Sequence, residues 1–61
     1  MPKVWFDVPE EMPVDGQEVW VRRYDLWTSF AAEWDATAAE FVTPTGLRMP
    51  WWMAGKWKVK V

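Results

Sequence analysis

The length, composition and charge of the chain exclude several classes of protein. Its 61 residues make one domain, residues 1–61, and the absence of cysteine and histidine removes disulfides, thiolate metal sites and the usual zinc ligand. The net charge of −2 gives no general attraction to nucleic acid, and no apolar run approaches the ~20 residues that span a membrane. We therefore expect no metal, no cofactor and no membrane segment.

The N-terminal half of the chain predicts two strands separated by a turn-rich loop. Lys3–Val8 alternates like a short strand, which Pro9 ends because proline cannot donate to a ladder. Residues 10–16 form a loop that closes on the turn signal Asp15-Gly16. Gln17–Tyr24 is the clearest strand. One face of this strand would carry Val19, Val21 and Arg23, and the other Trp20, Arg22 and Tyr24.

The segment after the expected hairpin tip at Asp25-Leu26 has two interpretations. Trp27–Asp35 alternates, with Phe30, Ala32 and Trp34 on one face, and would pair with the preceding strand. A helix over Ser29–Phe41 is the alternative, because its first residues resemble a capping box and alanine is frequent there. The alternation favours the strand.

The C-terminal third predicts three more short strands. Glu40–Thr43 lies between turns at residues 35–39 and 44–46, and Arg48–Met53 and Lys56–Val61 are joined around Ala54-Gly55. In the last strand Trp57, Val59 and Val61 would face inward and the three lysines outward. The whole pattern predicts an all-β fold, a small antiparallel barrel or curled sheet of five or six strands with an aromatic core.

Residues 5–21 resemble a known protein family. Their sequence, WFDVPEEMPVDGQEVWV, is similar to the opening of a domain-of-unknown-function family found in bacteriophage and prophage genomes. Members of that family begin Trp-x-x-Val, continue through Leu-Pro-x-x-Gly-Gln and enter a Val-x-Val strand. Trp52-Met53 corresponds to a Trp-Met near the family's end, but the following residues depart from it. The resemblance brings no catalytic residues and implies a phage-derived accessory protein in the cytoplasm of the host cell.

Candidate catalytic groups are few. The carboxylates near the first loop (Asp7, Glu10, Glu11 and Asp15) fit no calcium loop, and a solvated acidic loop explains them better. Ser29 is the only serine, and the chain has no histidine to activate it. We therefore expect a protein that is not an enzyme.

Residues 56–60 interleave basic and aromatic side chains, as single-strand nucleic-acid binders do. Alternation places Trp57 on the face opposite the lysines, so Trp57 and the lysines could not hold one strand together. Lysines on an edge strand more often prevent edge-to-edge pairing. We therefore disfavour nucleic acid as a partner.

The seven tryptophans are the main functional signal. A core this small can hide about four of them, and tryptophan, tyrosine and arginine are enriched at binding hot spots. The competing interpretation is that the rings merely complete a small core. The candidate partner-binding residues are Trp20, Arg22, Tyr24, Trp27, Trp51 and Trp52.

The predicted function is that of a non-enzymatic phage or prophage accessory protein. It would bind a protein partner, such as a host defence or regulatory factor, or a second copy of itself, through an aromatic sheet face. A small carbohydrate-binding module is one alternative, because Gly16-x-x-Val19, Phe30-x-Ala32-x-Trp34 and Trp57 are similar to motifs of chitin- and cellulose-binding modules. A minor virion component is the other.

Overall fold

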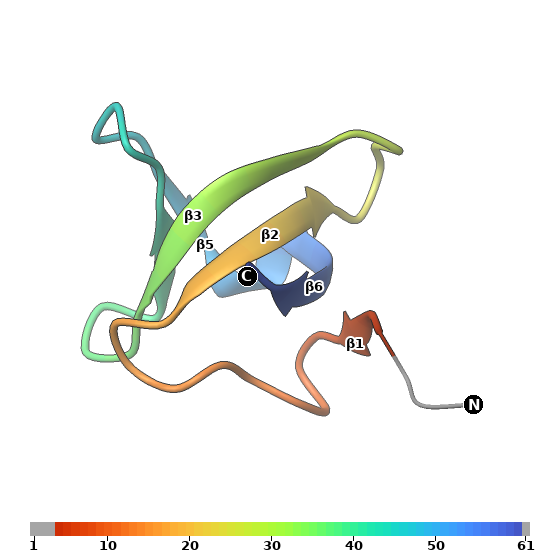
Figure 1. Cartoon of the computed structure of the whole chain (residues 1–61), viewed down its shortest axis with the longest axis horizontal. Coiled ribbons are helices and arrows are strands. Elements are labelled where there is room, and N and C mark those ends of the chain that lie inside the picture. The colour runs from red at the N-terminus through yellow and green to blue at the C-terminus, as the bar shows by residue number, and fades with distance from the viewer. Residues whose placement is uncertain (1–3, 61) are drawn as a thin grey trace.

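The computed structural model describes residues 4–60, which form one antiparallel sheet of six strands in the order β1-β6-β2-β3-β4-β5 (Figure 1). The elements are β1 (Phe6–Asp7), β2 (Glu18–Arg23), β3 (Ser29–Asp35), β4 (Glu40–Val42), β5 (Arg48–Pro50), the 3₁₀ helix η1 (Trp51–Met53) and β6 (Ala54–Val59). The edge strands β1 and β5 do not pair with each other. The all-β prediction is confirmed, and of the two predicted architectures the curled sheet is the one that forms.

The inner face of the curled sheet holds the core. Val19 and Val21 of β2 and Phe41 of β4 are fully buried. The ring centroids of Trp34 and Phe41 lie 4.6 Å apart, and those of Phe6 and Trp57 lie 4.7 Å apart. The same core cluster includes Ala32, Met49 and Ala54. The core therefore mixes aliphatic and aromatic side chains and is not predominantly aromatic.

The alternative helix over residues 29–41 does not form. Ser29–Asp35 pairs with β2 on one side, where Phe30 lies opposite Val21, and with β4 on the other, where Trp34 lies opposite Phe41. Alternate burial in a central strand therefore overrides the helix propensity of the alanines.

Two predicted strand boundaries near the C-terminus were wrong. The strand expected over Arg48–Met53 ends at Pro50, and η1 occupies residues 51–53. The backbone N–H of Trp51 donates to the carbonyl of Ala39 (3.0 Å), and that of Tyr24 donates to the carbonyl of Met53 (3.0 Å). These two bonds fix η1 against distant segments, so that β6 begins at Ala54 instead of Lys56.

The first and last strands along the chain also differ in length from the predicted ones. The strand expected over Lys3–Val8 is reduced to Phe6–Asp7, and Lys3 and Val61 lie outside the described residues. Val59 was expected to face inward. It lies opposite Val19 but remains 46% exposed, since β1 reaches only as far as Trp57 and nothing covers the end of β6.

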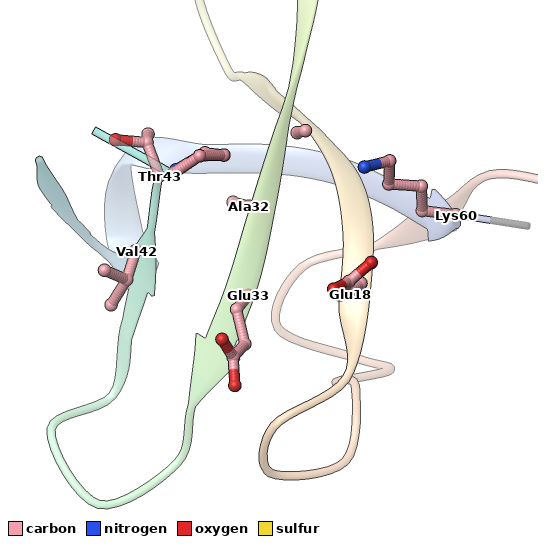
Figure 2. A pocket seen from close by; sticks show the side chains of 8 residues that line it. Glu18, Ala32, Glu33, Val42, Thr43 and Lys60 are labelled. Carbon is pink, nitrogen blue, oxygen red and sulfur yellow. The ribbon is translucent and has the colours of Figure 1, made fainter. Parts of the chain in front are cut away.

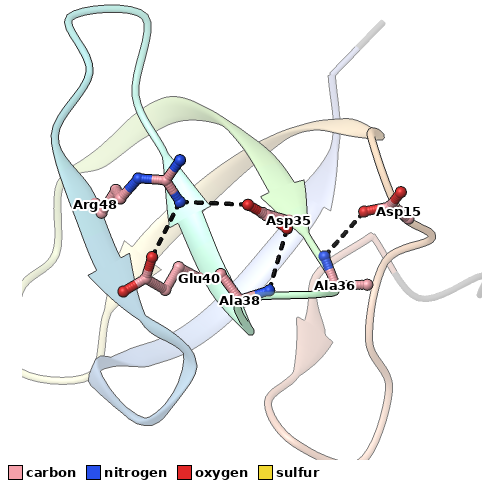
Figure 3. A network of polar contacts seen from close by, with 6 residues as sticks. All are labelled: Asp15, Asp35, Ala36, Ala38, Glu40 and Arg48. Carbon is pink, nitrogen blue, oxygen red and sulfur yellow. Dashed lines mark hydrogen bonds and ion pairs between the residues drawn. The ribbon is translucent and has the colours of Figure 1, made fainter.

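A polar network ties the turns at one end of the sheet together (Figure 3). Arg48 donates to Asp35 (3.3 Å) and to Glu40 (3.1 Å), while the backbone N–H of Ala38 donates to Asp35 (3.2 Å). Asp15 accepts from the backbone N–H of Ala36 (2.9 Å). The predicted turn at Asp15-Gly16 is confirmed, and Gly16 adopts a φ of +81° there.

Replacing Arg48 by glutamine is expected to raise the pKa of Asp35. The pKa of this carboxyl lies below its usual range because the Ala38 N–H and the Arg48 guanidinium both bind its ionised form. A carboxyl whose pKa is depressed by folding stabilises the fold above its unfolded pKa of about 3.9, and that contribution is lost as the pH falls through the lower folded value. The acid transition should therefore begin at higher pH in Arg48→Gln.

Nuclear magnetic resonance titration of the side-chain carboxyl carbons measures this shift. Part of the depression should survive in the variant, because the bond from Ala38 remains. Asp25 serves as the control, since the pKa of this carboxyl is lowered by a hydrogen bond from its own partner Arg23, which Arg48→Gln leaves in place. An unchanged titration of Asp35 would show that Arg48 does not stabilise its carboxylate.

Candidate interaction face

The outer face of the sheet gathers tryptophan rings and cations. Because Val19 and Val21 point into the core, Trp20 and Arg22 point to the opposite side of β2. On the neighbouring strand β6, Lys58 lies opposite Trp20 and Lys56 lies opposite Arg22. The alternation that buries Trp57 therefore places the lysines on the same side as Trp20 and Arg22.

The rings and cations on this side are in direct contact. The Arg22 guanidinium carbon lies 5.2 Å from the ring centroid of Trp5 and 5.4 Å from that of Trp27. The Lys58 ammonium lies 4.9 Å from the Trp5 ring, and the Lys60 ammonium lies 5.5 Å from the Trp20 ring. All four distances are within the roughly 6 Å range of a cation–π interaction. We call this surface the tryptophan–cation face; its members are Trp5, Trp20, Arg22, Trp27, Lys58 and Lys60.

The tryptophan–cation face is positively charged although the chain as a whole is acidic. Within residues 4–60, Arg22, Lys58 and Lys60 form no ion pair. Other cations are neutralised: Arg23 pairs with Asp25 at 2.6 Å, and Lys56 pairs with Asp7. Of the two consecutive arginines, Arg23 is thus paired with a carboxylate, whereas Arg22 contacts two indole rings.

Two acidic residues mark the border of the positively charged surface at the N-terminal end of β2. Glu18 and Glu33 lie directly opposite each other on β2 and β3, and both carboxylates point to the outer side (Figure 2). They line a shallow hollow together with Ala31, Ala32, Val42, Thr43, Pro44 and Lys60. The positive charge of the face is therefore confined to the region between Lys60 and the β2–β3 turn.

The six predicted partner-binding residues fall into two groups. Trp20, Arg22 and Trp27 belong to the tryptophan–cation face, and Trp27 is 89% exposed. Trp51 and Trp52 are exposed on η1, so the expectation that they share a sheet face with the others was wrong. Their displacement follows from the end of β5 at Pro50.

Tyr24 lies beside both groups. Its side chain is exposed and lines a hollow at the β2–β3 turn with Arg22 and Trp27. Its backbone N–H is the donor to Met53 at the end of η1. Tyr24 is thus the residue that connects the sheet to η1.

Sequence reasoning missed three members of the face. Trp5 was not among the candidate residues, but its ring lies against Arg22 and Lys58. Lys58 and Lys60 were considered only as edge-strand lysines; β1 pairs with β6 at Lys56 and Trp57, and beyond that point β6 pairs with β2 alone, where Lys58 lies opposite Trp20. The available signal was the strand alternation itself, which separates Trp5 from Phe6 and the lysines from Trp57.

The acidic loop has mainly structural contacts. Asp7 pairs with Lys56, Asp15 binds the Ala36 N–H, and the carbonyl of Glu11 accepts from the Trp57 indole N–H (2.8 Å). Between Val4 and Lys60, no three Asp or Glu side chains gather in a way that could hold a metal ion. Over the same residues, no helix is long and apolar enough to cross a bilayer.

We compared the chain with known proteins to look for relatives that share this surface. Comparison of the chain with protein-family models, with curated proteins and with solved structures gives no match.

Proposed function

We propose that this chain is a binding module without catalytic activity, which contacts a protein partner through the tryptophan–cation face. The observation that supports this proposal is the grouping of three tryptophan rings with three cations that have no ion pair within residues 4–60, all on one side of the sheet. Tryptophan and arginine are enriched among the residues that dominate the energetics of protein interfaces, because an indole ring buries a large area and a guanidinium presents several hydrogen-bond donors in one plane.

The contacts of the carboxylates favour binding over catalysis. Asp7, Asp15 and Asp35 are held by Lys56, by the Ala36 N–H and by Arg48, each in a contact between segments of the fold. A general acid or base requires a carboxyl that is available to a substrate proton. These three groups instead stabilise turns and strand pairs.

The ring contacts disfavour a carbohydrate partner. A sugar platform requires several ring faces that are open to the flat side of a pyranose. Here Trp5 is contacted by Arg22 and Lys58, and Trp20 by Lys60. Trp27 is 89% exposed, but Arg22 contacts its ring as well, so each of the three rings on this face already has a cation over it.

The resemblance of residues 5–21 to bacteriophage proteins directs the search for a partner to bacteria. We propose a host protein as the partner. A virion protein is the alternative, and the mass of a cross-linked product distinguishes the two.

Site-specific photo-cross-linking in bacterial cells tests the proposal. A benzophenone amino acid replaces Trp27 on the face in one variant and Trp52 on η1 in the other, two rings that are 89% and 62% exposed. We expect a protein adduct from position 27 and none from position 52. Adducts from position 52 alone, or from neither position, would show that the tryptophan–cation face is not the contact surface.

A further inference from the structure

We infer, resting on the proposed function, that the partner contacts this face with an extended acidic segment whose carboxylates alternate along its chain. Arg22, Lys58 and Lys60, which have no ion pair in the part of the chain that the structure describes, are the residues that would receive these carboxylates. Charge complementarity therefore identifies the chemistry of the occupant.

The cations are already positioned to receive an anion. The ring contacts hold Arg22 over Trp5 and Trp27, and Lys58 over Trp5. A cation on a ring face keeps most of its N–H donors free, and a guanidinium binds a carboxylate with two parallel hydrogen bonds. Holding a long side chain in place before binding lowers the conformational entropy that binding would otherwise cost.

The spacing of the three cations fits an extended peptide. Arg22 lies level with Lys56 of β6, and Lys58 follows two residues along the same strand. Lys60 comes just after the end of β6 at Val59, where its backbone N–H donates to the carbonyl of Glu18 (3.3 Å). Alternate positions on a strand are about 7 Å apart, so the three cations occupy three successive levels of the sheet. An extended segment with acidic residues at every second position repeats at the same interval.

The same ring contacts disfavour single-stranded nucleic acid. Non-specific strand binders stack bases on open aromatic faces, whereas bases reaching Trp5 or Trp20 would have to displace Arg22, Lys58 or Lys60.

Fluorescence anisotropy with a labelled peptide of alternating glutamate and alanine tests the inference. The matched peptide has glutamine in place of glutamate, and single-stranded oligothymidylate of equal charge is the third probe. We expect binding of the glutamate peptide that weakens as salt is added, with little binding of the other two. Arg22→Gln and Lys58→Gln should each weaken it about tenfold, since a charge-assisted hydrogen bond contributes about 1.5–3 kcal/mol.

Arg48→Gln is the matched control. It removes the same charge from the chain, but Arg48 lies on the edge strand β5, where it is paired with Asp35 and Glu40. Its affinity for the glutamate peptide should stay within about twofold of the wild type, because the remote charge is screened by salt. Circular dichroism establishes that all three variants are folded.

Several results would overturn the inference. Equal binding of the glutamine peptide, tighter binding of oligothymidylate, or no effect of Arg22→Gln and Lys58→Gln would each do so. Self-association that both variants abolish would identify a second copy as the occupant. If position 27 cross-links to a protein while the glutamate peptide does not bind, the inference of an acidic partner segment is wrong and the proposed function stands. If position 27 gives no adduct, the proposed function itself fails.

Discussion

Replacing Phe41 by alanine is expected to remove most of the free energy of unfolding. Phe41 is fully buried, and its ring centroid lies 4.6 Å from that of Trp34. Truncating a buried phenylalanine to alanine costs about 3–5 kcal/mol, because burial is lost and a cavity remains. A domain of this length has roughly 3–9 kcal/mol of stability in total. The Phe41 side chain therefore accounts for much of the total free energy of unfolding.

Urea denaturation followed by far-ultraviolet circular dichroism measures this loss. The control is Leu47→Ala on the β4–β5 hairpin, where the side chain is 70% exposed and truncation should change stability by less than about 0.5 kcal/mol. If Phe41→Ala unfolded at the same urea concentration as Leu47→Ala, the inner face would not be the core of this protein.

Replacing Gly55 by alanine is expected to destabilise the protein by about 1–3 kcal/mol, the usual cost of overpacking. An added Cβ would lie 2.9 Å from Cα and 3.3 Å from N of Tyr24, which are backbone atoms that cannot turn aside. The Tyr24 N–H donates to Met53, and the Val8 N–H donates to the carbonyl of Gly55 (3.1 Å), so hydrogen bonds hold both segments. The substitution therefore forces β6 away from the end of β2.

Combining Gly55→Ala with Tyr24→Ala tests whether the close approach to the Tyr24 backbone causes the loss of stability. Because the closest atoms belong to the Tyr24 backbone, Tyr24→Ala should not relieve the destabilisation, and the two substitutions should show little favourable coupling in urea unfolding. Gly46→Ala is the comparison for backbone strain, since its φ is +90° and no atom lies within 4 Å of the added Cβ. Wild-type stability in Gly55→Ala would contradict the close approach.

The strands could be predicted because their signals are local. Alternation identified β2 and β3, and the turn at Asp15-Gly16 was found from its residue types. η1 could not be predicted, because it is fixed by bonds to Ala39 and Tyr24, which are distant in sequence. The choice between a barrel and a curled sheet was equally non-local, since it depends on whether β1 meets β5.

Only half of the tryptophan–cation face was predictable. Trp20, Arg22 and Trp27 were found because their residue types are typical of interfaces. The contribution of Lys58 and Lys60 depends on which strand lies next to β6, and their role had been judged only against Trp57 of the same strand. Knowing the strand order would have placed Trp5, the lysines and Arg22 together.

The position of β6 has a consequence for synthesis in the cell. β6 is the last of the described strands along the chain, yet it lies between β1 and β2. While the ribosome is still making the C-terminal segment, β1 has no strand to pair with and the inner side of Val19 and Val21 lacks Trp57. Synthesis must therefore have passed residue 59 before the sheet can close over its core, and the earlier strands emerge from the ribosome with their apolar residues uncovered.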